Sequence, residues 1–262
     1  MNQNDFKEPD IGRAKFEAHK LAKSLHIISP SQYDIEDIAM SLGIYVREEP
    51  LIGAEARLIR NGNRGIIRIN PRIINKGRKA FTIAHEIGHW ILHDRNIQVD
   101  TEKEILESSP QVIEKEANAF AGSFLMPSYL FYPICQNETP TLELINSLAN
   151  TFSTTLTATA IRFTEEALFP CAIVFSKDGI ISWWTANKSS RIWIERRQEI
   201  DTDSNAFSLE EGETSTRRRV PLSYWFEDEN KFRGQSLYEQ STHLGYYGIT
   251  ITLLSLEDKL GY

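Results

Sequence analysis

The sequence is poor in cysteine and contains no long apolar run. Its two thiols, Cys135 and Cys171, are too few for a disulfide framework and are not spaced as a metal pair, so both are predicted to be buried thiols. No apolar stretch approaches the roughly 20 residues that would span a bilayer, and the first twenty residues lack the apolar core of a signal peptide. A cytoplasmic protein without a membrane partner is therefore expected.

The sequence also lacks an excess of positive charge. Its formal net charge is -7, whereas a protein that coats nucleic acid nonspecifically needs clustered Lys and Arg to neutralise phosphates. This argues against such a protein. The apolar fraction of 41% and the charged fraction of 25% are those of an ordinary globular protein, and 262 residues are enough for one or two domains.

Apolar periodicity and turn residues divide the chain at about residue 167. Residues 1–167 are predicted to be mainly helical with a small sheet, which begins with a strand at residue 44 and continues as a hairpin around the turn Asn61-Gly62-Asn63. The helices are expected at 11–26, 35–42, 78–93, 111–125, 141–152 and 154–166. Residues 168–262 change to short aromatic and β-branched runs. We therefore expect an α+β fold with a smaller, β-rich C-terminal domain.

The segment 81–93, FTIAHEIGHWILH, contains the pattern HExxH. At about 100° per residue, His85 and His89 lie on one helical face, one turn apart, so both imidazoles can bind one metal ion. Glu86 is offset by one residue, and its carboxylate can reach the attacking water and take its proton. The flanks are uncharged and apolar, which favours a catalytic helix seated in a core over a helix whose histidines only hydrogen-bond to neighbours.

A tetrahedral catalytic zinc needs a third protein ligand. His93 lies eight residues after His85, which is about 12 Å along a helix and too far for one ion, so it is predicted to cap the helix or to support a ligand from behind. Carboxylates on the helix at 111–125 are the remaining candidates. Glu114 shares a face with Asn118, which would hydrogen-bond the outer nitrogen of a ligand histidine. Glu114 is favoured, and Glu116 stays open as the alternative.

Two blocks, FTIAHEIGHWILH at 81–93 and EKEANAFAGSFLMP at 114–127, make the sequence resemble the ImmA/IrrE family of metallo-endopeptidases. The resemblance covers about residues 10–185. It implies a zincin-like, gluzincin-type peptidase domain followed by a sensor-like C-terminal domain, with one zinc ion per chain. The implied ligands are His85, His89 and Glu114, and the implied catalytic residue is Glu86.

The resemblance also implies a substrate, since relatives cleave helix-turn-helix repressors of stress-response, phage or mobile-element genes and thereby relieve repression. Some relatives carry a DNA-binding helix-turn-helix ahead of the peptidase, but only about ten residues precede the first helix here. The repressor is therefore expected to be a separate protein. Two other functions stay open: a zinc-containing protein that binds a repressor without cutting it, and a metalloprotease toxin held inactive by an antitoxin.

The C-terminal part contains four of the five tryptophans and the basic run 217–219. Aromatic residues interleaved with Arg would suit single-stranded nucleic acid. From residue 191 onward, however, nine basic residues stand against thirteen acidic ones. The aromatic residues are therefore interpreted as the core of a small regulatory or substrate-recognition domain, and single-stranded DNA or a small molecule stays open as its trigger.

Two further expectations concern the substrate. Tyr129 and His243 are candidates for stabilising a tetrahedral oxyanion, although neither belongs to a motif. An extended peptide is expected to pair along the strand at 65–70, taken as the edge of its sheet.

Overall fold

The computed structural model describes residues 8–93, 110–136, 139–187, 190–195, 197–245 and 248–258. The chain forms two compact units, one of Met1–Leu130 with Ala149–Thr155 and one of Phe131–Leu148 with Leu156–Tyr262. This division differs from the boundary predicted at residue 167, because most of the segment 131–166 groups with the C-terminal sheet. No helix among the described residues is long and apolar enough to cross a membrane.

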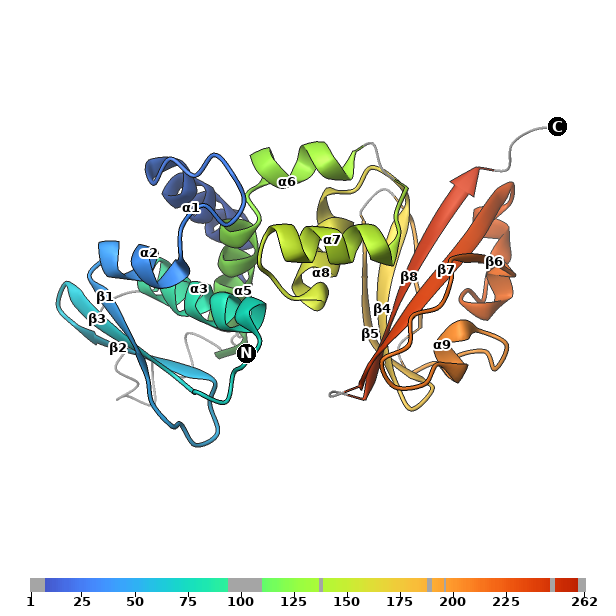
Figure 1. Cartoon of the computed structure of the whole chain (residues 1–262). Coiled ribbons are helices and arrows are strands. Elements are labelled where there is room, and N and C mark those ends of the chain that lie inside the picture. The colour runs from blue at the N-terminus through green and yellow to red at the C-terminus, as the bar shows by residue number, and fades with distance from the viewer. Residues whose placement is uncertain are drawn as a thin grey trace, which may run out of the picture. The chain divides into compact units, whose positions relative to one another are not determined.

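The first unit combines helices with a three-stranded sheet (Figure 1). Its helices are α1 (Ile11–Ser24), α2 (Ile35–Ser41), α3 (Lys76–Leu92) and α5 (Pro110–Leu125), and its strands are β1 (Ile44–Glu48), β2 (Ala56–Asn61) and β3 (Arg64–Ile69). All of these elements were expected from the sequence. The side chains of Asp34 and Asn75 cap α2 and α3 by accepting hydrogen bonds from backbone amides of their first turns.

The strand order β1-β3-β2 corrects one expectation. Strand β3 pairs in parallel with β1 and antiparallel with β2, so it is the central strand and not an edge. The hairpin of β2 and β3 was predicted from the sequence. The pairing of β1 with the other side of β3 depends on tertiary packing, which a local sequence pattern does not show. An extended peptide therefore cannot pair along residues 65–70.

Helix α3 is the buried centre of the first unit. Its residues Ile83, Ala84 and Ile87 are fully buried and pack in one cluster with Phe120 of α5. A Cβ atom added at Gly88 would lie 3.2 Å from the backbone of Ala117 on α5. Glycine at this position therefore allows the two helices to come close together.

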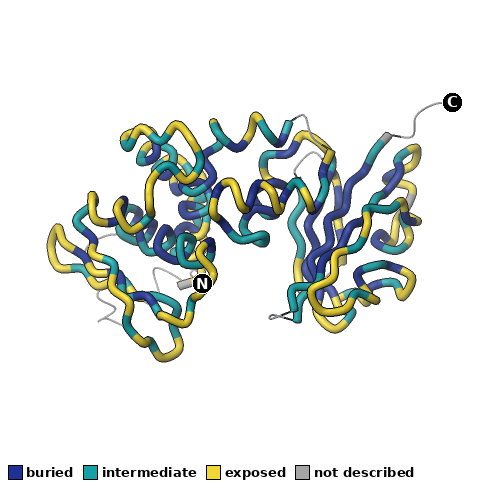
Figure 2. Tube along the Cα trace, in the orientation of Figure 1, coloured by how far each residue is buried: buried dark blue, intermediate teal, exposed yellow. Residues whose placement is uncertain are grey.

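The second unit is built on an antiparallel sheet in the order β5-β4-β8-β7-β6 (Figure 1). The strands are β4 (Cys171–Lys177), β5 (Ile180–Ala186), β6 (Arg218–Val220), β7 (Gln235–Leu244) and β8 (Ile249–Asp258). Helix α8 (Leu156–Glu166) packs on β4 and β5, and α9 (Asn205–Ser208) packs on β7. Figure 2 shows that the central strands β4 and β8 are buried along most of their length.

Helix α6 (Ser128–Cys135) was not predicted, because Pro133 lies inside it. It is followed by α7 (Leu142–Thr151), whose first amide donates to the side chain of Gln240 on β7 at 2.7 Å. The second unit also contains the single-turn helices η1 (Leu222–Tyr224) and η2 (Glu229–Phe232). Cys135 and Cys171 are free, fully buried thiols, as predicted, and burial raises the pKa of each to about 12.

A buried carboxylate ties the irregular segments of the second unit to its sheet. Glu239 on β7 is fully buried. It accepts hydrogen bonds from the Ser204 hydroxyl and the Asn205 amide at 2.9 Å, from the Arg218 guanidinium at 2.8 Å and from the Trp225 indole at 3.0 Å. One side chain thus connects α9, β6 and the segment at 225 with β7.

We expect Glu239→Gln to lower the free energy of unfolding of the second unit by about 3 kcal/mol, because an amide leaves buried donors and the Arg218 charge without an acceptor. Urea unfolding followed by tryptophan fluorescence measures this, since four of the five tryptophans lie in residues 168–262. The matched control is Glu210→Gln, an exposed residue of the same unit, which should change the value by less than about 0.5 kcal/mol. Equal stabilities of the two variants would contradict this account of Glu239.

Candidate metal centre

Three ligand atoms from two helices converge in the first unit. His85 and His89 lie one turn apart on α3, with their Nε2 atoms 3.0 Å from each other. Glu114, in the early part of α5, places Oε2 at 3.1 Å from Nε2 of His85 and Oε1 at 3.3 Å from Nε2 of His89. The close packing of α3 and α5 at Gly88 holds this arrangement, and the group can bind a metal ion.

The geometry and the chemistry of these donors fit zinc. Ligand atoms at about 2.0–2.1 Å from a tetrahedral zinc lie about 3.3 Å apart. This is close to the 3.0–3.3 Å that separate the two Nε2 atoms from each other and each of them from one carboxylate oxygen of Glu114. Burial, together with the neighbouring His85 and His93, lowers the pKa of His89 to about 3. Its imidazole is therefore neutral, which is the form that binds metal. The side chain of Glu114 is 52% exposed, so the centre is open to solvent on its side.

Glu86 lies beside this group and outside it. The backbone N–H of Leu58 on β2 donates a hydrogen bond to its carboxylate. Burial, followed by the negative charge of Glu114, raises the pKa of Glu86 to about 7, and the hydrogen bond from Leu58 acts in the opposite direction. The arrangement places a carboxylate that can exchange a proton next to the ligands, as a general base requires.

Each ligand imidazole has a partner at its outer nitrogen. Oδ1 of Asn118 lies 2.9 Å from Nδ1 of His85, so this side chain is placed as the sequence analysis expected. His93 follows the last residue of α3, where its backbone N–H donates to the carbonyl of His89. Its ring lies behind the second imidazole, with the two Nδ1 atoms 2.9 Å apart. His93 is not part of the group of side chains that could hold a metal ion.

Glu116 points away from the ligand atoms, which leaves Glu114 as the carboxylate of the group. Oε2 of Glu116 lies 3.0 Å from Nε2 of His93, a contact that was not predicted from the sequence. A signal for it existed, because Glu116 shares a helical face with the buried Phe120, and a buried carboxylate needs a partner.

The two oxyanion candidates, Tyr129 and His243, lie in different units. The hydroxyl of Tyr129 donates to the backbone carbonyl of Ile27 at 2.7 Å. Tyr129 lies beyond the C-terminal end of α5, and Glu114 is about 16 Å before that end at 1.5 Å per residue. The structure therefore does not bring Tyr129 to the metal ligands. His243 lies on β7 of the second unit, opposite Thr250, and its role stays a prediction.

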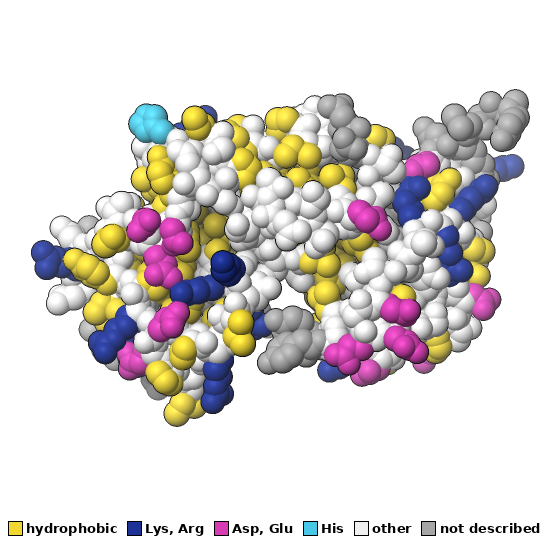
Figure 3. Space-filling view, in the orientation of Figure 1, with side chains coloured by type: hydrophobic (Ala, Val, Ile, Leu, Met, Phe, Trp, Pro, Cys, Tyr) yellow, Lys and Arg dark blue, Asp and Glu magenta, His cyan; other side chains and the backbone are white. Residues whose placement is uncertain are grey.

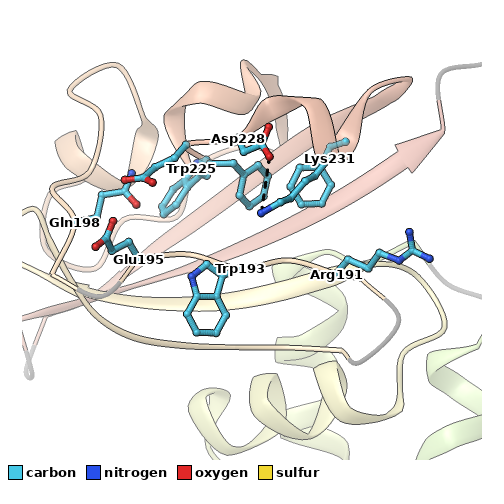
Figure 4. Close-up of a pocket in the computed structure, with 10 residues that line it drawn as sticks. Arg191, Trp193, Glu195, Gln198, Trp225, Asp228 and Lys231 are labelled. Atoms are coloured by element: carbon cyan, nitrogen blue, oxygen red, sulfur yellow. Dashed lines mark ion pairs between the residues drawn. The ribbon is translucent and has the colours of Figure 1, made fainter.

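The second unit contains a small cavity of about 100 Å³, which is lined in part by the segment that follows β5 (Figure 4). Trp225 is fully buried in its wall, whereas Trp193 is 73% exposed. Lys231 at this cavity pairs with Asp228 at 3.9 Å. Acidic and basic side chains both line it, so the cavity favours no single class of ligand.

The basic run at 217–219 is largely neutralised within the second unit. Arg217 pairs with Glu257, and Arg218 pairs with the buried Glu239. The face shown in Figure 3 carries acidic as well as basic side chains over each unit. Two of the three arginines are thus occupied by ion pairs, which weakens the case for nucleic acid at this run.

Comparison with known proteins agrees with the geometry. Residues 39–164 match the family model of Peptidase_M78, the IrrE N-terminal-like domain. A search of the curated proteins gives no significant match. Eleven chains of solved structures match. One, titled "Mycobacterium tuberculosis transcriptional regulator", has 15% sequence identity and a TM-score of 0.58 over 93% of this chain and 88% of the other. At that identity the likeness shows the fold alone.

The matched residues include both helices of the metal centre, with His85, Glu86, His89 and Glu114. The sequence pattern, the convergence of the three donors and the family model therefore agree. Through residues 39–164, the chain is similar to the IrrE N-terminal-like domain of the Peptidase_M78 family.

Proposed function

We propose that the protein is a zinc-dependent endopeptidase that acts in the cytoplasm, cleaves a helix-turn-helix repressor and so relieves repression. The observation that carries this proposal is the convergence of His85, His89 and Glu114 beside the carboxylate of Glu86. The match of residues 39–164 to a peptidase family model supports the chemistry.

Each residue of the proposed site has a separate role in peptide-bond hydrolysis. A zinc ion at this centre supplies Lewis acidity to the scissile carbonyl and to water. Glu86 takes a proton from the attacking water and passes it to the leaving amine. Asn118 fixes the ring of His85 through its outer nitrogen. The open side of the centre, where Glu114 is half-exposed, admits the peptide.

The edge of the sheet beside the centre is β2, whose partner among the described strands is β3 alone. The amide of Asn70 donates to the carbonyl of Glu55, so the antiparallel ladder uses the backbone groups of alternate residues and leaves those of Ala56, Leu58 and Arg60 pointing outward. The amide of Leu58 reaches Glu86. An extended substrate paired along β2 would therefore pass the catalytic carboxylate.

Two alternatives share the metal site. A protein that binds a repressor without cutting it has no use for Glu86 next to the ligands, and the position of this carboxylate argues against it. A metalloprotease toxin would use the same chemistry on another partner. Growth arrest on expression without the neighbouring gene would favour the toxin, whereas two chelator-sensitive repressor fragments would favour the proposed function.

The general base is tested with Glu86→Gln. The variant should bind zinc like the wild type and cleave at least about 100-fold more slowly, because an amide cannot take the proton of water. The zinc-loaded protein is incubated with the helix-turn-helix protein encoded beside it, with and without single-stranded DNA, and fragments are mapped by mass spectrometry. The control is Glu114→Ala, which should lose zinc and cleavage together. A fully active Glu86→Gln protein would refute the assignment.

The substrate strand is tested with Ala56→Pro. Proline removes an outward N–H without removing a hydrogen bond of the β2–β3 ladder. Loss of one backbone hydrogen bond, about 1–1.5 kcal/mol, should reduce kcat/KM about 10-fold at unchanged zinc affinity. Ala56→Val keeps the N–H and serves as the matched control. Cleavage by Ala56→Pro at the rate of Ala56→Val would exclude pairing at this position.

A further inference from the structure

A line of hydrogen bonds leads from the second ligand imidazole into the interior of the first unit. Nδ1 of His89 lies 2.9 Å from Nδ1 of His93, and Nε2 of His93 lies 3.0 Å from Oε2 of Glu116. The backbone amide of Asp10 donates to Oε1 of Glu116 at 2.7 Å. The side chains of His93 and Glu116 are only 11% and 10% exposed, so water cannot readily replace these contacts.

The position of His89 fixes the direction of every bond in this line. Nε2 of His89 faces the ligand group, so in the neutral, metal-binding ring the proton is on Nδ1 and is donated to His93. Nδ1 of His93 must then accept, which leaves its proton on Nε2. This proton is donated to Glu116, whose carboxylate accepts at both oxygens.

We propose that Glu116 is a positioning residue that selects the tautomer of His93 and thereby holds the imidazole of His89 in its metal-binding orientation. The inference rests on the proposed metal site. It assigns unlike supports to the two ligand rings: His85 is held by the neutral amide of Asn118, whereas His89 is held through a histidine by a buried carboxylate. Partners of this kind commonly change metal affinity 10- to 100-fold.

A purely structural role for Glu116 makes a different prediction. Asp10, which donates to Glu116, is also the N-cap of α1 and accepts from the amide of Arg13. The guanidinium of Arg13 donates to the carbonyl of Leu92 at the end of α3. Glu116 therefore also fastens the start of α1 to the metal helices. If this were its only task, loosening α1 by another route would have the same effect on the metal.

Variants that differ in hydrogen-bond polarity separate the two roles. Gln at position 93 can accept from His89 through its oxygen and donate to Glu116 through its nitrogen, whereas Leu can do neither. In Glu116→Gln the amide nitrogen cannot accept, so one of the two donors is lost. The third variant, Arg13→Ala, loosens α1 without touching the line.

We expect the zinc dissociation constant, measured by competition with a chromophoric chelator, to rise 10- to 100-fold in Glu116→Gln and in His93→Leu. It should stay within about 3-fold of the wild-type value in His93→Gln and in Arg13→Ala. Nitrogen-15 NMR of the histidine rings in the zinc-loaded wild-type protein should show the Nε2–H tautomer for His93 and the Nδ1–H tautomer for His89.

Three results would overturn the inference alone. The first two are wild-type zinc affinity in Glu116→Gln and the Nδ1–H tautomer for His93. The third is an equal loss of zinc affinity in Arg13→Ala, which would show that Glu116 acts only through α1. A wild-type protein that binds no zinc would instead overturn the proposed function, so the two failures are distinguishable.

Discussion

The metal centre depends on the close contact between helices α3 and α5 at Gly88. Any side chain there would meet the backbone of Ala117 at 3.2 Å. Two histidines on one helix supply only two ligands, and the third comes from a helix that must lie within reach of both. The contact at Gly88 brings Glu114 to 3.1–3.3 Å from both Nε2 atoms. The same contact brings Asn118 and Glu116 to their partners, so ligands and supporting residues share one packing constraint.

Much of the first unit was predictable from the sequence, because its signals are local. The histidine spacing of HExxH fixed one helical face, helical rise excluded His93 as a ligand, and the four-residue spacing of Glu114 and Asn118 placed both on one side of α5. The Asp34 cap and the turn at 61–63 marked element boundaries, whereas the Asn75 cap of α3 was not predicted.

Apart from helix α6, the missed features depend on contacts between distant residues. The central position of β3 follows from its pairing with β1, which the hairpin pattern does not show. The hydroxyl of Tyr129 is a chemically reasonable hydrogen-bond donor to an oxyanion. Only the fold shows that Tyr129 lies beyond the C-terminal end of α5 and donates to Ile27 instead. No partner of Glu116 was predicted from the sequence. In the structure its buried carboxylate contacts His93 and the backbone amide of Asp10.

The second unit is organised by charges that are satisfied internally. Glu239 accepts hydrogen bonds from several segments, and Arg217 and Arg218 both form ion pairs with carboxylates. Little positive charge from the basic run is therefore left for a polyanion. The residues proposed for catalysis all lie in the first unit, and a role of the second unit in recognition or control stays a prediction.

We propose above all that His85, His89 and Glu114 bind one catalytic zinc ion. Anomalous diffraction at the zinc absorption edge, from crystals of the zinc-loaded protein, tests it most directly. The account predicts one peak per chain, about 2.0–2.2 Å from Nε2 of both histidines and from a carboxylate oxygen of Glu114. A peak bound instead by Glu116 or by a cysteine, or no peak at α3, would contradict it.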